Sequence, residues 1–505
     1  MFGLSQKEKN NALYHALDNG NSEAATKLLD KGADPNFATY SYGPILFRAI
    51  NQYSEETALA CVRPLLAKGA SLANTDENYG RTALHHACWR TPSHLKVLKT
   101  LIEAGSDVSR VDRYGQTPLM TCVLQKAWPA ADLLLDHCAR DDKSSSNVLV
   151  TAITQGAPVS LLSRLVEKLD IDINTQTQNE GATALHAAVA AGYHAAVEWT
   201  LGRKERRVNL KDKEGKTALQ LAVASGRSDM ARALLEAGAS PITRDEEGNV
   251  PLVTAARGGS QDIVEMLINA KAVLDAADKY GMTALSVAAA AGSIRMVMTL
   301  LAAADNAQVK LNLEPGLFAA AERGHGRVLE LLIAAGANVN HVDDNGRTPL
   351  MRAVNADQVE TLSILIKAGA KPDIADRHGM FAYDHAVSAG KLKAKDYLAR
   401  YRHEAVKTAE PAGVAGPADD FHYMRVNDHS LEVREGDGLT MTFNFWTQQV
   451  IFRDTERPAP VTVQNFADLQ RQEAIDEAYA KLKELGGNPP DPRVGSMQKK
   501  MPGLK

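Results

Sequence analysis

A short phrase recurs along most of this chain about every 33 residues: glycine, one variable residue, threonine, proline or alanine, then leucine. The complete phrase begins at Gly80, Gly115, Gly181, Gly215, Gly281 and Gly346. Self-similarity at a period of about 20–50 residues is typical of proteins that stack one small structural unit on the next. Because such a unit cannot bury its apolar side alone, the period predicts a solenoid.

The spacing of the glycines is regular enough to locate missing units. Successive separations of 34, 33 and 33 residues join Gly181, Gly215, Gly248 and Gly281. The intervals from Gly115 to Gly181 and from Gly281 to Gly346 are twice as long, so each holds one unit without its glycine. Their remnants are residues 147–150, followed by Gly156, and residues 317–320. With the weaker ends included, the sequence predicts about twelve units.

Each residue type in the phrase has a physical role. Glycine adopts the backbone conformation that a hairpin tip requires. Threonine caps the following helix, proline fits the first helical turn, and leucine points into the core. A second set of glycines, eleven residues further on in most units, ends the first helix of a pair: Gly192, Gly226, Gly259, Gly292 and Gly324. The sequence therefore predicts two helices per unit.

These phrases, with closing Gly-Ala phrases at residues 32–34, 69–71, 238–240, 336–338 and 369–371, resemble the ankyrin repeat over about residues 8–402. The resemblance implies a non-enzymatic scaffold or adaptor that binds a protein partner in the concave groove beside its finger tips. A secreted bacterial effector that binds host proteins and a regulatory subunit of a partner enzyme remain alternatives. It also implies that His85 and His186 hydrogen-bond between adjacent fingers.

Composition narrows the class of function. A formal net charge of −4 argues against a general nucleic-acid binder. No apolar run reaches the roughly 18 residues of a membrane span, and the first residues lack a signal-peptide core. Cys61, Cys88, Cys122 and Cys138 are scattered over separate units and are expected to be buried and reduced. We expect a cytoplasmic protein, with delivery into another cell by a specialised secretion system as the alternative.

The pattern changes after the repeats. A small, flexible segment at 406–420 is predicted to be a linker between a solenoid at 8–405 and a module at 421–487. Alternating residues predict strands at 430–434, 439–445 and 449–452, after a first strand flanked by His422 and His429. A helix is expected at about 466–485 and a disordered tail at 488–505. The predicted fold class is mainly α, a helical-repeat solenoid with a small α+β module.

No catalytic, phosphate-binding or metal-binding motif is present in the sequence. The best nucleophile–base pair is Cys88 with His85, one helical turn apart, but no third group orients it. Adjacent His85 and His86 point in different directions and make a poor metal pair. An enzyme centred on the C-terminal module is a further alternative, although the module lacks a clustered catalytic set. We therefore expect no enzymatic activity and no cofactor or metal.

The exposed aromatic residues are more informative. Tyrosine precedes the tip glycine in four units, where its large ring makes it an effective interface residue. Tryptophan and arginine lie close by in the sequence. Trp128 is expected to pack inside an irregular unit, where Trp128 and Pro129 replace the glycine turn. The alternative is that each ring only covers a neighbouring finger. The candidate protein-binding residues are Tyr42, Tyr79, Arg81, Trp89, Arg90, Arg110, Arg113, Tyr114 and Tyr280. Partner identity and oligomeric state stay open.

Overall fold

The computed structural model describes residues 4–39, 43–91, 93–137 and 145–407 and the backbone of five strands between 421 and 465. Side chains of these residues are described up to Tyr401, apart from residues 39, 145 and 146. Tyr42, Cys138, the predicted helix at 466–485 and the tail at 488–505 lie outside the described residues. The last repeat helix extends to Lys407, and the remainder of the predicted linker also lies outside them. The predicted domain boundaries therefore stay predictions.

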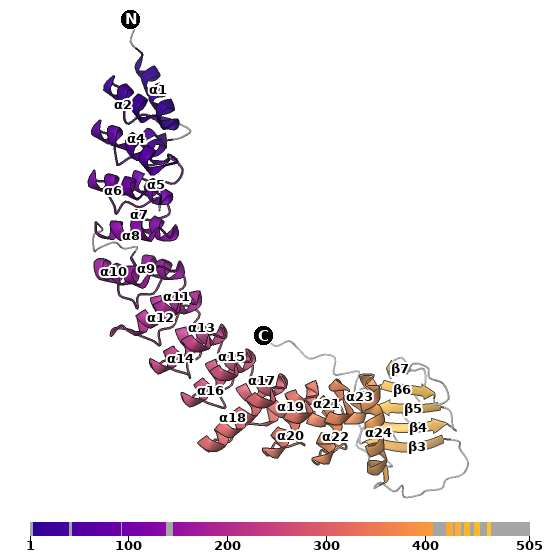
Figure 1. Cartoon of the computed structure of the whole chain (residues 1–505). Coiled ribbons are helices and arrows are strands. Elements are labelled where there is room, and N and C mark those ends of the chain that lie inside the picture. Colours follow the sequence, from indigo (N-terminus) through magenta and orange to yellow (C-terminus); the bar gives the residue numbers. More distant parts are fainter. Residues whose placement is uncertain are drawn as a thin grey trace, which may run out of the picture. The chain divides into compact units, whose positions relative to one another are not determined.

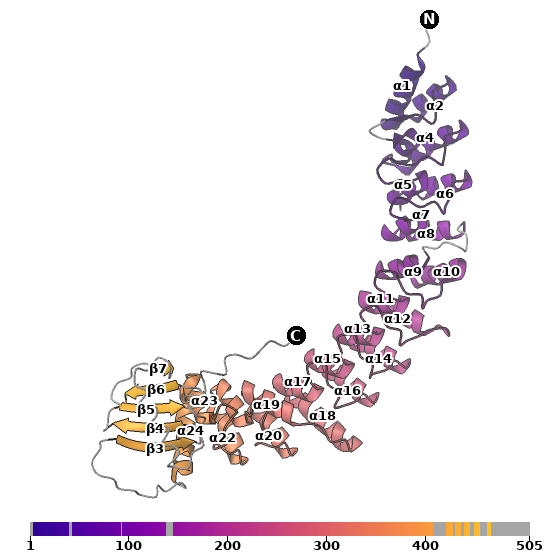
Figure 2. The same ribbon diagram turned by 180° about the vertical axis from the view of Figure 1, so that it is seen from behind.

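Two compact units divide the chain, 1–284 and 285–505. In the first, helices alternate between two parallel rows (Figures 1 and 2). The first helices of the pairs are α1 (Gln6–Asp18), α3 (Ile45–Ile50), α5 (Ala83–Arg90), α7 (Pro118–Leu124), α9 (Ser145–Thr154), α11 (Ala184–Ala191), α13 (Ala218–Ala224) and α15 (Pro251–Arg257). The second helices are α2 (Ser22–Asp30), α4 (Glu55–Ala67), α6 (Leu95–Glu103), α8 (Trp128–Leu135), α10 (Val159–Leu169), α12 (His194–Leu201), α14 (Ser228–Glu236) and α16 (Gln261–Asn269).

The second unit continues the same alternation. Its first helices are α17 (Ala284–Ala290), α19 (Glu314–Arg323), α21 (Pro349–Ala353) with the 3-10 turn η1 (Val354–Ala356), and α23 (Ala382–Ser388). Its second helices are α18 (Ile294–Ala307), α20 (Gly326–Ala334), α22 (Val359–Lys367) and α24 (Leu392–Lys407). Over the described residues the helices make twelve pairs, as the glycine spacing predicts.

Both units that lack the phrase are helix pairs. Residues 147–150 lie in α9, which packs between α7 and α11, and residues 317–320 lie in α19, which packs against α21. The core remains apolar through these units, since Leu149, Leu162 and Leu317 are buried. These two units therefore lack the glycine phrase in the sequence but still form helix pairs that pack in the stack.

The capping roles assigned to threonine and proline are confirmed. The Thr117 side chain accepts the N–H of Met120, and Thr217 accepts that of Gln220. Pro118 and Pro349 occupy the first turn of α7 and α21. The expectation that Trp128 and Pro129 replace the glycine turn is wrong. Lys126 takes the left-handed position at φ 57°, eleven residues after Gly115, and α8 then begins at Trp128, which is half-buried.

The tip glycines serve a second purpose that spacing did not reveal. Gly215 has φ 73°, and a Cβ built on it would lie 2.8 Å from the backbone nitrogen of Glu246 in the next finger. That nitrogen donates to the Glu214 carbonyl at 3.1 Å, so adjacent fingers are joined by a backbone hydrogen bond. Equivalent bonds run from Arg113 to Tyr79 at 2.8 Å and from Lys213 to Glu180 at 3.0 Å. Glycine is needed both for its conformation and for this close approach.

Beyond the repeats, five strands form an antiparallel sheet in sequence order: β3 (Phe421–Asn427), β4 (Ser430–Glu435), β5 (Leu439–Asn444), β6 (Gln449–Asp454) and β7 (Thr462–Asn465). The strands expected between 421 and 452 are confirmed, including the hairpin that pairs Glu435 with Leu439. Strand β7 was not anticipated because Thr-Val-Gln-Asn lacks alternating large apolar residues. In the central strand, Phe443 pairs with Leu431 on one side and Val450 on the other.

The tip glycines allow a matched stability test. Gly281 has the same φ as Gly215, 73°, but nothing lies within 4 Å of its added Cβ. Gly281→Ala should therefore cost only backbone strain, about 1–2 kcal/mol. Gly215→Ala should cost at least about 1 kcal/mol more, because the added methyl must also displace a neighbouring backbone. Urea unfolding of both full-length variants measures the difference, and equal losses would contradict the close-approach argument.

The sheet offers a second test. Phe443→Asp places a charge in a row of apolar pairing partners, so the strands between 421 and 465 should become sensitive to limited proteolysis. Residues 8–402 should stay resistant, because repeats depend only on their neighbours. Thr440→Asp is the control, since Thr440 pairs with Arg434 and Arg453 and an aspartate there gains opposite charges. Unchanged resistance of the Phe443→Asp chain would show that the strand does not form a core.

Candidate functional site

An aspartate shapes the turn of several fingers. Asp112 is fully buried, and its Oδ1 accepts the backbone N–H groups of Tyr114 at 2.8 Å and Gln116 at 2.9 Å. The same pattern recurs at Asp212, Asp278, Asp343 and Asp376. Because the carboxylate satisfies two amide groups of the turn, the tip has a fixed backbone and its side chain projects outward. The residue before the tip glycine is therefore presented on a rigid support.

Histidines bind two of the fingers to the helix of the preceding repeat. His85 Nδ1 lies 2.9 Å from Thr82 Oγ1, and its Nε2 lies 2.9 Å from the carbonyl oxygen of Gln116. His186 repeats this geometry with Thr183 at 2.7 Å and Lys216 at 3.0 Å. A carbonyl can only accept, so Nε2 carries the proton. Nδ1 accepts the N–H of Thr82 in His85 and of Thr183 in His186, so each ring is neutral. Burial lowers the pKa of both histidines, which favours that neutral form.

Four of the predicted binding residues form one cluster, which we name the Arg81 cluster: Tyr79, Arg81, Trp89 and Tyr114. The Arg81 guanidinium carbon lies over the Tyr79 ring at 4.5 Å and over the Trp89 ring at 4.9 Å. The Tyr79 and Tyr114 ring centroids are 6.3 Å apart. The three aromatic side chains are 43, 47 and 66% exposed for Tyr79, Trp89 and Tyr114. Two finger tips and the helix α5 thus build one continuous aromatic surface with a cation inside it.

The remaining predicted residues have different surroundings. Arg113 extends the cluster, since its backbone and its Nη1 donate to the carbonyls of Tyr79 and Asn78. Arg90 is half-buried and donates to the Gln52 carbonyl at 2.7 Å, so it joins two repeats. Arg110 is exposed beside Asp107. Hydrogen bonds from Ser109 are the main cause of the lowered pKa of the Asp107 carboxyl, and the charge of Arg110 lowers it further. Tyr280 is 73% exposed with Lys279 over its ring at 5.2 Å, five repeats beyond Tyr114.

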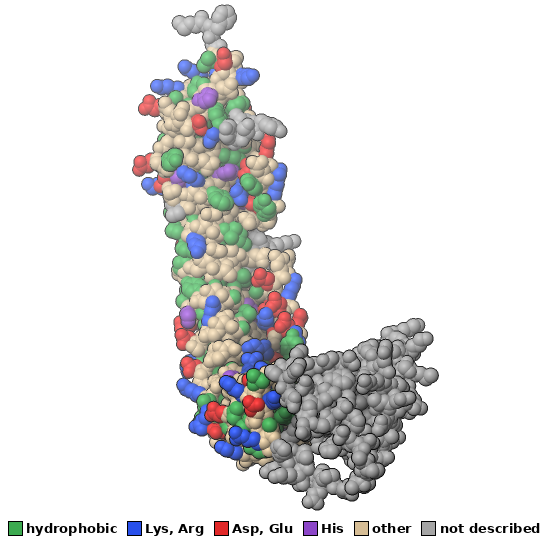
Figure 3. All heavy atoms as spheres, turned by 90° about the vertical axis from the view of Figure 1, so that its right-hand side faces the viewer, with side chains coloured by type: hydrophobic (Ala, Val, Ile, Leu, Met, Phe, Trp, Pro, Cys, Tyr) green, Lys and Arg blue, Asp and Glu red, His purple; other side chains and the backbone are tan. Residues whose placement is uncertain are grey.

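Sequence reasoning missed two exposed residues near these. Val111 is 49% exposed at the base of the finger that carries Tyr114, and Tyr53 is fully exposed in the turn between α3 and α4. A large apolar residue directly before a finger aspartate was the available signal for Val111. On the side where the first helices lie, hydrophobic side chains are exposed at intervals among charged ones (Figure 3).

In the possible nucleophile–base pair of Cys88 and His85, the histidine is not free to act as a base. Cys88 is buried, and both ring nitrogens of His85 are engaged by Thr82 and Gln116. His86 stacks on Phe47 at 4.4 Å, with Nε2 3.1 Å from Asp76. Burial raises the pKa of the Cys61 thiol to about 11. Among the described residues, no three histidine, cysteine or carboxylate side chains are grouped as metal ligands.

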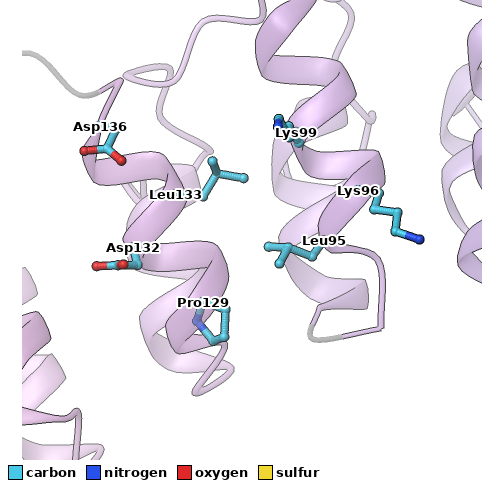
Figure 4. A pocket seen from close by; sticks show the side chains of 7 residues that line it. All are labelled: Leu95, Lys96, Lys99, Pro129, Asp132, Leu133 and Asp136. Atoms are coloured by element: carbon cyan, nitrogen blue, oxygen red, sulfur yellow. The ribbon is translucent and has the colours of Figure 1, made fainter.

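A shallow cleft of about 340 Å³ lies between α6 and α8 (Figure 4). Its lining is Leu95, Lys96, Lys99, Pro129, Asp132, Leu133 and Asp136. Both carboxylates are ion-paired with Arg164 of α10, at 2.7 Å for Asp136, and Lys99 lies 3.8 Å from Glu103. Since the charged groups that line the cleft already form ion pairs, the cleft is an ordinary surface groove between two packed helices. Separately, none of the described helices is both long and apolar enough to cross a membrane.

Comparison with known proteins agrees with the repeat geometry. The family profile described as ankyrin repeats (3 copies) matches residues 13–112, 149–245, 241–312 and 317–409, well over half of the chain. The chain is 29% identical over 182 residues to the Nuclear factor NF-kappa-B p105 subunit of Gallus gallus, covering 33% of this chain and 18% of that protein. It is 28% identical over 215 residues to SH3 and multiple ankyrin repeat domains protein 2 of Homo sapiens, covering 41% and 11%.

The similarity to these curated relatives spans less than a fifth of their length. Among solved structures, the human ASB11 ankyrin repeat domain is 26% identical, with a TM-score of 0.36, and the match covers 42% of this chain and 98% of that one. An ankyrin repeat domain from Acinetobacter baumannii AYE is 29% identical, with a TM-score of 0.29, over 43% and 96%.

The histidine bridges predict a pH dependence of stability. Because burial lowers the folded-state pKa of His85 and His186, the unfolded chain binds more protons below about pH 6.5. Stability should be full above that pH and fall as the pH drops, by at most about 1.4 kcal/mol per pH unit for each histidine. Gln220 already makes the same bridge, from Nε2 to the Asn249 carbonyl at 3.4 Å. The variant His85→Gln with His186→Gln should therefore fold and lose less stability between pH 7.5 and 5.5 in urea titrations. An unchanged loss would contradict the assignment.

Proposed function

The chain belongs to the ankyrin-repeat family, whose repeats are protein-interaction modules, and on that basis we propose that it is a non-enzymatic adaptor that holds a protein partner on the Arg81 cluster. The observation that supports this proposal is the contact of Arg81 with both Tyr79 and Trp89, next to Tyr114. Tyrosine, tryptophan and arginine are the residue types that dominate binding energy at protein interfaces. Here all three occur together, with the tyrosine and tryptophan rings exposed around the partly buried arginine.

Rigidity supports the proposal. The Tyr114 tip is fixed by Asp112, and the Tyr79 N–H donates to Asp76 Oδ1 at 2.6 Å. Side chains carried on a fixed backbone lose little conformational freedom when a partner binds, so more of the contact energy appears as affinity. Tyrosine and tryptophan add large contact area with few rotatable bonds. A partner would meet a surface that needs little rearrangement.

The C-terminal sheet belongs to the proposal as a separate element. We propose that it caps the array or binds a second partner, because its backbone is a distinct antiparallel sheet rather than another helix pair. The adaptor would act in the cytoplasm, where its cysteines stay reduced. Arg110, Arg113 and Tyr280 are proposed as peripheral contacts of the same face. The proposed role of the Arg81 cluster in partner binding does not depend on these three residues.

A partner captured by the full-length chain tests the proposal directly. Replacing Tyr79 and Tyr114 together by alanine should weaken binding by roughly 1–4 kcal/mol, measured by isothermal titration, if they are energetic centres. The fold should survive, because both rings are exposed and their tips are held by backbone bonds. Circular dichroism checks this.

Tyr280→Ala is the matched control, because its backbone makes the same bonds to Asp278. It should change affinity far less than the double variant. Affinity that is unaffected by the double variant would rule the cluster out. Loss confined to the Phe443→Asp chain would move partner binding to the C-terminal sheet.

A further inference from the structure

Arg81 is held in an unusual way for a surface arginine. Its guanidinium lies over two aromatic rings, and its side chain is only 18% exposed. Nε is fully buried and makes no hydrogen bond. The nearest acid, Asp112, places Oδ2 at 3.8 Å from Nε, which is too long for a hydrogen bond. Within the described residues, the flat faces of the guanidinium therefore contact the aromatic rings, whereas its N–H donors make no hydrogen bonds.

The two Nη groups are the available donors. Among the described residues, no atom accepts a hydrogen bond from either of them, and neither is fully buried as Nε is. A guanidinium carries five N–H donors in a planar fork, four of them on the Nη atoms. The rings fix the plane of this fork, and the fork reaches the surface between Tyr79 and Trp89.

We propose that Arg81 is a preorganised receptor for a carboxylate side chain of the partner, an inference that rests on the proposed function of the Arg81 cluster. A planar guanidinium matches a carboxylate with two parallel hydrogen bonds. The aromatic contacts already restrict the arginine rotamers, so binding costs less side-chain entropy. The partner segment presents an aspartate or glutamate flanked by apolar residues, which pack on the Tyr79, Trp89 and Tyr114 rings.

Local charge favours the same partner. Arg110 and Arg113 are exposed on the neighbouring finger, whereas the Asp112 carboxylate is buried behind Arg81. Asp112 forms only a long ion pair with Nε, at 3.8 Å, and the Nη edge faces away from it toward the proposed partner. Glu77 is the exposed acid on the Tyr79 finger, so a long run of acidic residues would fit less well than a single one.

The chain contains a matched control. Arg347 occupies the same place in the repeat phrase as Arg81, and its Nε lies 3.9 Å from Asp376 Oδ2 of the next finger. Its Nε is also buried without a hydrogen bond. However, Asp376 Oδ2 is bonded to His385 Nε2 at 2.8 Å, and no ring of the described residues lies over Arg347. A generic effect of removing this arginine should appear in both variants, and a binding effect only at Arg81.

End-blocked pentapeptides, Gly-Leu-X-Leu-Gly with X as glutamate, glutamine or phosphoserine, provide the probe. Each is titrated into the full-length chain while tryptophan fluorescence is recorded, and Trp89→Phe identifies the signal. The glutamate peptide should bind about fivefold more tightly than the glutamine peptide, the difference between a charge-assisted and a neutral hydrogen bond. Arg81→Gln should bring that ratio to about one, and Arg81→Lys should reduce it, because lysine lacks the fork. Arg347→Gln should leave it unchanged.

Equal affinities for the glutamate and glutamine peptides would overturn the inference, as would an equal loss in the Arg347→Gln chain. Preference for phosphoserine over glutamate by more than about tenfold would replace the carboxylate by a phosphate. These outcomes are separate from the proposed function. If Tyr79 and Tyr114 carry partner binding but the peptides show no charge preference, the adaptor proposal stands and the carboxylate inference falls.

Discussion

One recurring polar contact fixes successive repeats, the bridge from the third residue of a first helix to the finger of the next repeat. His85 and His186 make it with a neutral ring, and Gln220 makes it with an amide that donates to the Asn249 carbonyl. In each case the same side chain also meets the threonine that caps its own helix. Such buried polar groups are costly unless both sides are satisfied, so the bridge admits one position of the next finger.

The Arg81 cluster follows from that constraint. The Tyr114 finger is fixed by the His85 bridge, by the Asp112 turn and by the backbone bond from Arg113 to Tyr79, so the Tyr79 and Tyr114 rings stand close enough to meet. Arg81 belongs to the same finger as Tyr79 and forms an ion pair with Asp112 of the next finger. Its guanidinium lies over Trp89 of α5. An aromatic surface built this way keeps its shape without a partner, which is the property that a recognition surface needs.

The described residues place chemistry on the surface rather than in a cavity. The carboxylates that line the cleft between α6 and α8 are paired with Arg164, and both ring nitrogens of His85 are engaged by Thr82 and Gln116. Stacked helix pairs fill their interior with small apolar side chains such as Ala87, Ala188 and Ala255. Loops and tips are therefore where such a scaffold carries recognition.

The sequence by itself determined the repeat, because the period, the caps and the turn glycines each depend on one local backbone requirement. It located even the units around 147–150 and 317–320, since two intervals had double length. It also marked Tyr79 and Tyr114, because exposure at a hairpin tip is a local property. It could not show that Arg81 joins Tyr79 to Trp89, or that Arg90 instead binds the Gln52 carbonyl, because both contacts depend on side-chain directions. Nor could it show that Lys126 makes the turn, or that β7 completes the sheet, since neither residue type nor pattern signals them. Only the tertiary structure decided which arginine lies against exposed aromatic rings, because those contacts depend on how the side chains of neighbouring repeats pack.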